Sequence, residues 1–130
     1  MELISKEELV FKNGKPIAVD TIVQETPEAI VQRQVNAYNA KNLDAFLDTY
    51  SKDVEIYFND KLSFKGLEQM RKQYSFLNKT TDLYCQIENR IVINNKVIDK
   101  EKVRFGKQII KAVAIYEVKN GKINKVTFVD

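Results

Sequence analysis

The chain has 130 residues, which suits one domain with a single hydrophobic core and leaves too little sequence for two. Its 21 basic and 18 acidic residues give a net charge of +3, and no cluster of lysine and arginine concentrates that charge, so nucleic-acid binding is not expected. The sequence has no histidine and one cysteine, Cys85, which excludes an intramolecular disulfide, and we expect neither a metal nor another cofactor.

Residues 1–26 differ from the rest of the chain and are predicted to form an N-terminal extension to a domain at residues 27–130. The pair Asn13-Gly14 lies between two short apolar runs, which is a signal for a β-hairpin that pairs with the main sheet or with a partner subunit. The first residues have neither the basic leader nor the apolar core of a secretory signal, and no apolar run approaches the ~18 residues that span a bilayer. We therefore expect a cytoplasmic protein without membrane contact.

A first helix is predicted to begin at Pro27, because Thr26 can cap its N-terminus and proline is favoured at the first helical position. Its apolar stripe, at helical spacing, consists of Ile30, Val31, Val35 and Tyr38. Gln34 lies within that stripe, so the helix is expected to bury one polar side chain.

A second helix is predicted to follow Asn42 and to end near residues 51–53. Its apolar positions at i, i+3, i+4 and i+7 are Leu43, Phe46, Leu47 and Tyr50. A strand over residues 54–58, a short apolar segment over residues 62–64 and a third helix over residues 67–78 are expected next.

The remainder of the chain predicts four long strands, over residues 84–93, 97–105, 109–119 and 122–129. The connections between them are short and rich in asparagine and glycine, which favours antiparallel hairpins. The fold class is therefore α+β, with a strongly curved antiparallel sheet and three helices in the N-terminal half. Such a sheet with helices on one face tends to leave a pocket between the two layers.

Four segments carry a resemblance to a known superfamily: VQRQVNAYNAKNLDAFLDTYSKDVEIY, GLEQMRKQY, VIDKEKV and AIYEVKNGKINKVTF. They resemble the nuclear-transport-factor-2-like superfamily, and within it the SnoaL-like and steroid Δ-isomerase-like bacterial proteins, over roughly residues 27–129. The resemblance implies a cone-shaped fold with a cavity. It does not imply one activity, because the same cone hosts isomerases, hydratases, cyclases, epoxide hydrolases and binding modules.

The resemblance also allows a test for ketosteroid isomerase chemistry, which uses an aspartate base together with a tyrosine and a protonated aspartate as donors. Following the matches along the chain places Gln34 at the donor tyrosine, Phe58 at the base and Ala114 at the protonated aspartate. Two of these positions are hydrocarbon, so that reaction is not expected. Tyr74 falls on a supporting tyrosine and is expected to hydrogen-bond Gln34. The Arg-x-Asp spacing of epoxide hydrolases is absent.

An acidic strand is the remaining candidate for acid–base chemistry. Strand alternation places Asp99, Glu101 and Val103 on one face, and the family register implies that this face lines the pocket. Alternation on the preceding strand groups Arg90 with Tyr84, and a hairpin would bring Arg90 near the two carboxylates. Asp99 and Glu101 are then either an acid–base pair in the cavity or members of cross-strand ion pairs on the outer face.

The family register turns most of the aromatic side chains toward the same interior, where they line a predicted pocket of a few hundred cubic ångströms. The predicted ligand-binding residues are Gln34, Tyr38, Tyr50, Phe58, Met70, Tyr74, Arg90, Ala114, Tyr116, Val126 and Phe128. The opposite face carries Val113, Ile115, Thr127 and Val129, and an apolar outer face of this kind favours a homodimer.

The sequence therefore predicts a protein that binds a small and moderately apolar molecule with a polar head. If it is an enzyme, it would transform that molecule by acid–base chemistry of the isomerase, cyclase or lyase kind. The alternative is a non-catalytic protein-interaction module whose cavity is filled by its own side chains. In the second case no response to small ligands is expected.

Overall fold

A computed structural model of the chain describes residues 11–12, 15–16, 25–80 and 82–130. The helices are α1 (Pro27–Asn39), α2 (Leu43–Leu47), α3 (Leu67–Gln73) and the 3-10 helix η2 (Ser75–Lys79). The strands are β1 (Phe11–Lys12), β2 (Lys15–Pro16), β3 (Tyr50–Phe58), β4 (Lys61–Lys65), β5 (Leu83–Ile93), β6 (Lys96–Phe105), β7 (Gln108–Lys119) and β8 (Lys122–Val129). Within these residues, no helix is both long enough and apolar enough to cross a membrane.

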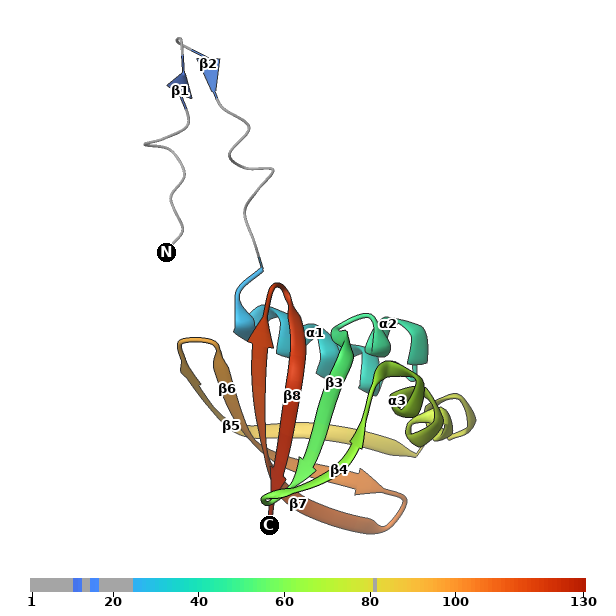
Figure 1. Cartoon of the computed structure of the whole chain (residues 1–130). Coiled ribbons are helices and arrows are strands. Elements are labelled where there is room, and N and C mark those ends of the chain that lie inside the picture. Colours follow the sequence, from blue (N-terminus) through green and yellow to red (C-terminus); the bar gives the residue numbers. More distant parts are fainter. Residues whose placement is uncertain (1–10, 13–14, 17–24, 81) are drawn as a thin grey trace.

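The main sheet has six strands in the order β4-β3-β8-β7-β6-β5. Neighbouring strands are antiparallel except for β3 and β8, which pair in parallel because the chain passes through the whole β5–β7 meander between them. The helices lie on one side of this curved sheet, and strands β5, β6 and β7 sweep away from β3 and β8 (Figure 1). The predicted α+β architecture with helices from the N-terminal half is therefore confirmed.

The hydrophobic core fills the space between the helices and the concave face of the sheet. Its most deeply buried side chains include Ile30, Val31, Phe46, Val54, Met70, Leu77, Val97, Ile123 and Val126. Both layers contribute to this core, which explains why the helical stripe of α1 and the alternation of the strands were readable in the sequence.

Helix α1 begins as predicted. The Thr26 side chain accepts a hydrogen bond from the backbone N–H of Ala29 at 3.1 Å, and Pro27 occupies the first helical position. Gln34 is buried within the apolar stripe, as expected. Helix α2 is capped in the same way by Asn42, whose side chain accepts from the N–H of Ala45 at 3.0 Å.

Two predicted helix ends were wrong. Helix α2 stops at Leu47, and Tyr50 already belongs to β3, because the Thr49 carbonyl accepts a sheet hydrogen bond from the N–H of Ile123. The third helix breaks at Tyr74, whose backbone leaves the helical region, and η2 follows. The break lets the Tyr74 ring pack on Phe46, with 4.8 Å between the ring centroids.

The tight connections of the meander adopt the backbone conformation that their asparagine and glycine residues predicted. Asn94, Asn120 and Gly121 all have positive φ, which the two-residue hairpin turns require. The four long strands consequently start and end within one residue of their predicted bounds.

A β-bulge in β5 was not predicted. The register shifts between Ile87 and Asn89, so that Ile87 lies opposite Glu101 while Arg90 lies opposite Asp99. The extra residue breaks the strict alternation that had placed Arg90 on the same face as Tyr84. Arg90 instead lies on the inner face, and Tyr84 is 54% exposed.

The N-terminal hairpin is present as far as the structure describes it, since Phe11 pairs with Pro16 and Lys12 with Lys15. The predicted pairing of this extension with the sheet or a partner lies outside the described residues. The boundary near residue 26 stays a prediction.

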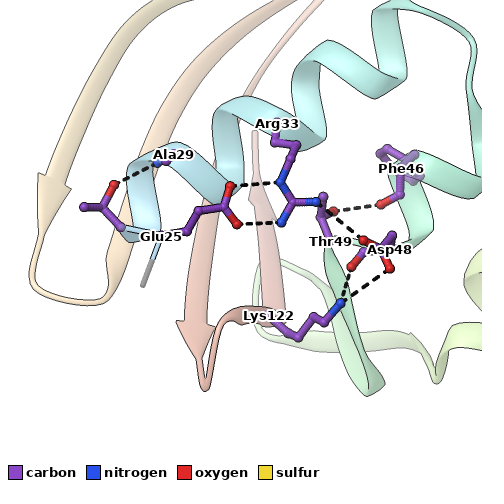
Figure 2. Close-up of polar contacts among 8 residues, drawn as sticks. Glu25, Ala29, Arg33, Phe46, Asp48, Thr49 and Lys122 are labelled. Atoms are coloured by element: carbon purple, nitrogen blue, oxygen red, sulfur yellow. Dashed lines mark hydrogen bonds and ion pairs between the residues drawn. The ribbon is translucent and has the colours of Figure 1, made fainter. Parts of the chain in front are cut away.

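An ionic cluster ties the start of α1 to its neighbours (Figure 2). Arg33 donates to both carboxylate oxygens of Glu25, at 2.9 and 2.7 Å, and lies 3.6 Å from Asp48. Lys122, on β8, also contacts Asp48 at 3.6 Å. The cluster links α1 with the end of α2 and the β7–β8 hairpin, although its exposed pairs contribute little free energy each.

Candidate ligand pocket

A pocket of about 130 Å³ lies between α1 and the concave face of the sheet. Helix α1, five strands of the sheet and Tyr74, which follows α3, reach it from different directions, and most of its polar groups are phenols. Its lining residues are Gln34, Val35, Tyr38, Tyr50, Tyr74, Cys85, Glu101, Val103, Ala112, Tyr116 and Phe128. The volume is smaller than the few hundred cubic ångströms predicted.

The aromatic packing explains the smaller volume. Phe46 fills the space beneath the pocket and contacts Tyr38, Tyr50 and Tyr74, with ring centroids 5.8, 5.1 and 4.8 Å apart. These three tyrosines therefore line the pocket and also pack in the hydrophobic core. Their tilted arrangement is the geometry that aromatic rings prefer.

Glu101 is the one carboxylate among the lining residues and is only 6% exposed. The Tyr116 hydroxyl donates a hydrogen bond to its Oε2 at 2.8 Å. Burial raises the pKa of the Glu101 carboxyl to about 7; the Tyr116 hydrogen bond opposes this, the charge of Asp99 adds to it, and Arg90 opposes it. A carboxyl group poised near neutrality can both accept and donate a proton.

Asp99 points inward like Glu101 but does not line the pocket. It is 0% exposed and forms a two-pronged ion pair with Arg90, from Nε to Oδ1 at 2.6 Å and from Nη2 to Oδ2 at 2.8 Å. Arg90 also donates to Gln32 at 2.8 Å. Of the two alternatives drawn from the sequence, the carboxylates lie on the inner face, and Asp99 belongs to an ion pair there.

The pocket tyrosines stay protonated. Burial is the main cause that raises the pKa values of Tyr38, Tyr50, Tyr74 and Tyr116 above the ordinary value. Burial likewise raises the pKa of the Cys85 thiol to about 12, so it is not an activated nucleophile. The pocket therefore presents neutral hydroxyl groups around a single titratable carboxyl.

Gln34 brings a polar amide to the roof of the pocket and is 5% exposed. Its Oε1 atom is buried and has no hydrogen-bond partner in the part of the chain that the structure describes. The expected hydrogen bond between Gln34 and Tyr74 is absent there, and the Tyr74 ring packs on Phe46. An unsatisfied buried acceptor costs free energy unless a ligand or water donates to it.

Six of the eleven predicted ligand-binding residues line the pocket: Gln34, Tyr38, Tyr50, Tyr74, Tyr116 and Phe128. The other five lie elsewhere. Phe58 is 56% exposed and packs against Phe128 at 5.6 Å. Met70, Ala114 and Val126 belong to the buried core, and Arg90 is held by Asp99.

Four lining residues were not predicted: Val35, Cys85, Val103 and Ala112. Val35 and Val103 lay on faces already identified as inward, so the existing patterns could have found them. Cys85 required the register with Val103, and Ala112 required the register that places it opposite Glu101.

Among the described residues, no three side chains of the metal-ligating types converge on a common point. The chemistry available in the pocket is that of a carboxyl group, hydroxyls and an amide.

Comparisons with solved structures show the same fold. An NTF2-like protein of unknown function from Cytophaga hutchinsonii superposes with a TM-score of 0.68 at 16% identity, over 82% of this chain and 91% of that chain. A candidate polyketide cyclase from Pseudomonas putida KT2440 gives 0.63 at 19% identity, over 80% and 90%. A candidate ketosteroid isomerase from Kribbella flavida gives 0.66 at 13% identity, over 79% and 76%.

No curated protein matches the sequence at a significant level. The family model described as the SnoaL-like domain matches residues 31–126, which include every lining residue of the pocket except Phe128. The cone fold, the inward-facing α1 stripe and the meander agree with that match. The chain belongs to the SnoaL-like domain family.

Proposed function

We propose that this protein binds a small, moderately apolar molecule in the pocket beneath α1 and that Glu101 exchanges a proton with the bound molecule. The observation that carries the proposal is Glu101 itself, a carboxyl group 6% exposed in a pocket otherwise lined by phenols and hydrocarbon. A buried carboxyl without a cation beside it is costly for a purely structural pocket and useful for acid–base chemistry.

A steroid isomerase reaction is not part of the proposal. Gln34, Phe58 and Ala114 stand where the resemblance implies the donor and base groups of that enzyme, and Phe58 is 56% exposed. The pocket volume, about 130 Å³, is also close to the ~150 Å³ cavity that holds a single benzene ring. Ligands with several fused rings would need a wider opening.

A thermal-shift screen tests the proposal. Small ring ketones, amines, alcohols, acids and short-chain fatty acids would be added to the wild type and to Tyr74→Phe and Glu101→Gln. A ligand at one hundred times its dissociation constant adds about 2.7 kcal/mol of stability and raises Tm by roughly 10 °C. We expect a shift in the wild type that both substitutions reduce.

The control for this screen is Glu117→Gln, the same chemical change outside the pocket, where Glu117 contacts Lys125 at 3.9 Å. It should respond to ligands as the wild type does. If no compound shifts Tm in any of these proteins, the binding function is wrong and the non-catalytic interaction module becomes the better explanation.

We further propose a homodimer through the outer face of the sheet. A continuous row of paired positions crosses that face, and four of its five members are apolar or aromatic: Ile91, Ile98, Ile115, Thr127 and Tyr57. Ile91 is 54% exposed. An apolar row bordered by charged residues supports self-association.

A further inference from the structure

We propose that the ligand of this pocket is a small primary amine with an apolar body about the size of one ring, and that its ammonium group is bound by Glu101 and Gln34. This inference rests on the proposed function and names the chemical class that the pocket selects. Three features of the lining support it: charge, unfilled hydrogen-bond acceptors, and aromatic walls of limited volume.

The charge of the lining favours a cation. Glu101 has no basic residue beside it in the pocket, because no lysine or arginine is among the lining residues. The nearest guanidinium, that of Arg90, is already engaged by Asp99 and Gln32. An ammonium group would supply the counter-charge that Glu101 lacks, whereas a carboxylate or phosphate ligand would add a second buried anion.

The hydrogen-bond inventory points the same way. Tyr116 donates to Oε2 of Glu101, and no hydrogen bond to its Oε1 is present among the described residues. Oε1 of Gln34 is buried and also lacks a donor. A primary ammonium offers three donors and an alcohol only one, so of the two only the ammonium has a donor for each acceptor.

The aromatic side chains that line the pocket suit the apolar body of such a ligand. The side chains of Tyr38, Tyr50, Tyr74, Tyr116 and Phe128 all line the pocket. Aromatic rings attract cations through their π-electron faces, and organic ammonium ligands are commonly held in aromatic cages. The pocket of about 130 Å³ admits a body the size of one ring, which makes benzylamine a suitable probe.

The test compares three probes of nearly equal size by isothermal titration calorimetry in phosphate buffer: benzylamine, benzyl alcohol and benzoate. At pH 8 we expect benzylamine to bind at least about tenfold more tightly than benzyl alcohol, because only the amine offers the positive charge and three donors. Benzoate should not bind measurably. Phosphate is chosen because amine buffers would compete for the same site.

The pH dependence sharpens the test. Alkylammonium groups have a pKa of about 10, so benzylamine keeps its charge from pH 6 to pH 8, while Glu101 loses its proton at a pKa of about 7. Affinity for benzylamine should therefore rise by roughly tenfold over this range. The groups that influence Glu101 from the surrounding elements are Tyr38, Tyr50, Tyr74, Cys85, Arg90, Asp99 and Tyr116. None of the tyrosines or the cysteine is expected to titrate in that window.

Two variants separate the contacts. Glu101→Gln should weaken benzylamine binding by about tenfold or more at pH 8, abolish its pH dependence and weaken benzyl alcohol binding by less than it weakens benzylamine binding. Gln34→Met removes the second acceptor at similar size and should weaken the amine by a few-fold while keeping the pH dependence. Glu117→Gln serves as the matched control and should leave all three affinities unchanged.

The outcomes distinguish this inference from the proposed function. Benzyl alcohol or benzoate binding as tightly as benzylamine, or an amine affinity that is flat from pH 6 to pH 8, overturns the amine inference and leaves a binding pocket in place. Binding only of the neutral compounds of the thermal-shift panel, the ring ketones and alcohols, does the same. Absence of binding by every probe and every panel compound overturns both.

Discussion

Both faces of the β5–β8 region carry charged and apolar residues, but the two faces bury their charged side chains to different extents. On β6, Val97, Asp99 and Glu101 face the helices and are buried, whereas Lys100 between them is exposed on the outer face. On the inner face, Asp99 forms an ion pair with Arg90, and Glu101 accepts a hydrogen bond from Tyr116. The outer face pairs its charges loosely across strands, as with Lys111 and Glu88 at 3.8 Å. Burial, rather than residue type, therefore decides which carboxylates can take part in chemistry.

The largest effect is expected from breaking the buried ion pair. Arg90→Met leaves Asp99 buried without its counter-ion and should lower the free energy of unfolding by about 3–5 kcal/mol, measured by urea denaturation. On the outer face, Lys111→Met removes the exposed member of a partly exposed pair and should cost less than about 1 kcal/mol. Similar losses in the two variants would contradict the difference between the faces.

A second effect concerns the pH dependence of stability. The pKa of Glu101 is about 7 in the folded protein against 4.5 for an ordinary glutamate, so folding favours its protonated form. That contribution is fully present below pH 4.5 and is lost as the pH rises through 7. Relative to Glu101→Gln, the wild type should therefore lose on the order of 3 kcal/mol between pH 4.5 and pH 8. Parallel stability curves for the two proteins would show that Glu101 is not buried.

A third prediction tests the outer face. Ile115→Lys places a charge in the middle of the apolar row and should convert a homodimer to a monomer in size-exclusion chromatography with light scattering. Because the Ile115 side chain is only partly buried, the fold should be retained. The control is Lys102→Gln on the same face of β6, away from the row. A wild type that is monomeric at high concentration would exclude the proposed dimer.

The smallest effect is expected in the ionic cluster at the start of α1. The two hydrogen bonds from Arg33 hold the pKa of Glu25 below its usual range, and Glu25→Gln removes the negative charge and one of the two acceptors (Figure 2). Since Arg33 and Glu25 are both about two-fifths exposed, the loss should be below about 1 kcal/mol and should shrink further in high salt. A larger loss would mean that the cluster holds α1 in place more strongly than exposed pairs normally do.

The local features of the fold could be predicted because each depends on residues close in sequence. Thr26 and Asn42 cap helices through their own side chains, and Asn94 and Asn120 provide the positive φ that hairpin turns require. The inward position of Gln34 followed from helical spacing alone. The predicted SnoaL-like resemblance was also confirmed, because it depends on the order and spacing of such local features along the chain.

The sequence by itself therefore determined the elements, their order, the family and most of the residues that face inward. Only the tertiary structure decided which of those residues meet. The bulge after Ile87 turned Arg90 inward against Asp99, which left Glu101 as the lining carboxylate. The end of α2 at Leu47 and the break at Tyr74 let three tyrosines gather around Phe46 and reduce the pocket to about 130 Å³. The physical reason is that a bulge or a helix end is selected by long-range packing and strand pairing, whereas caps and turns are selected by neighbouring residues.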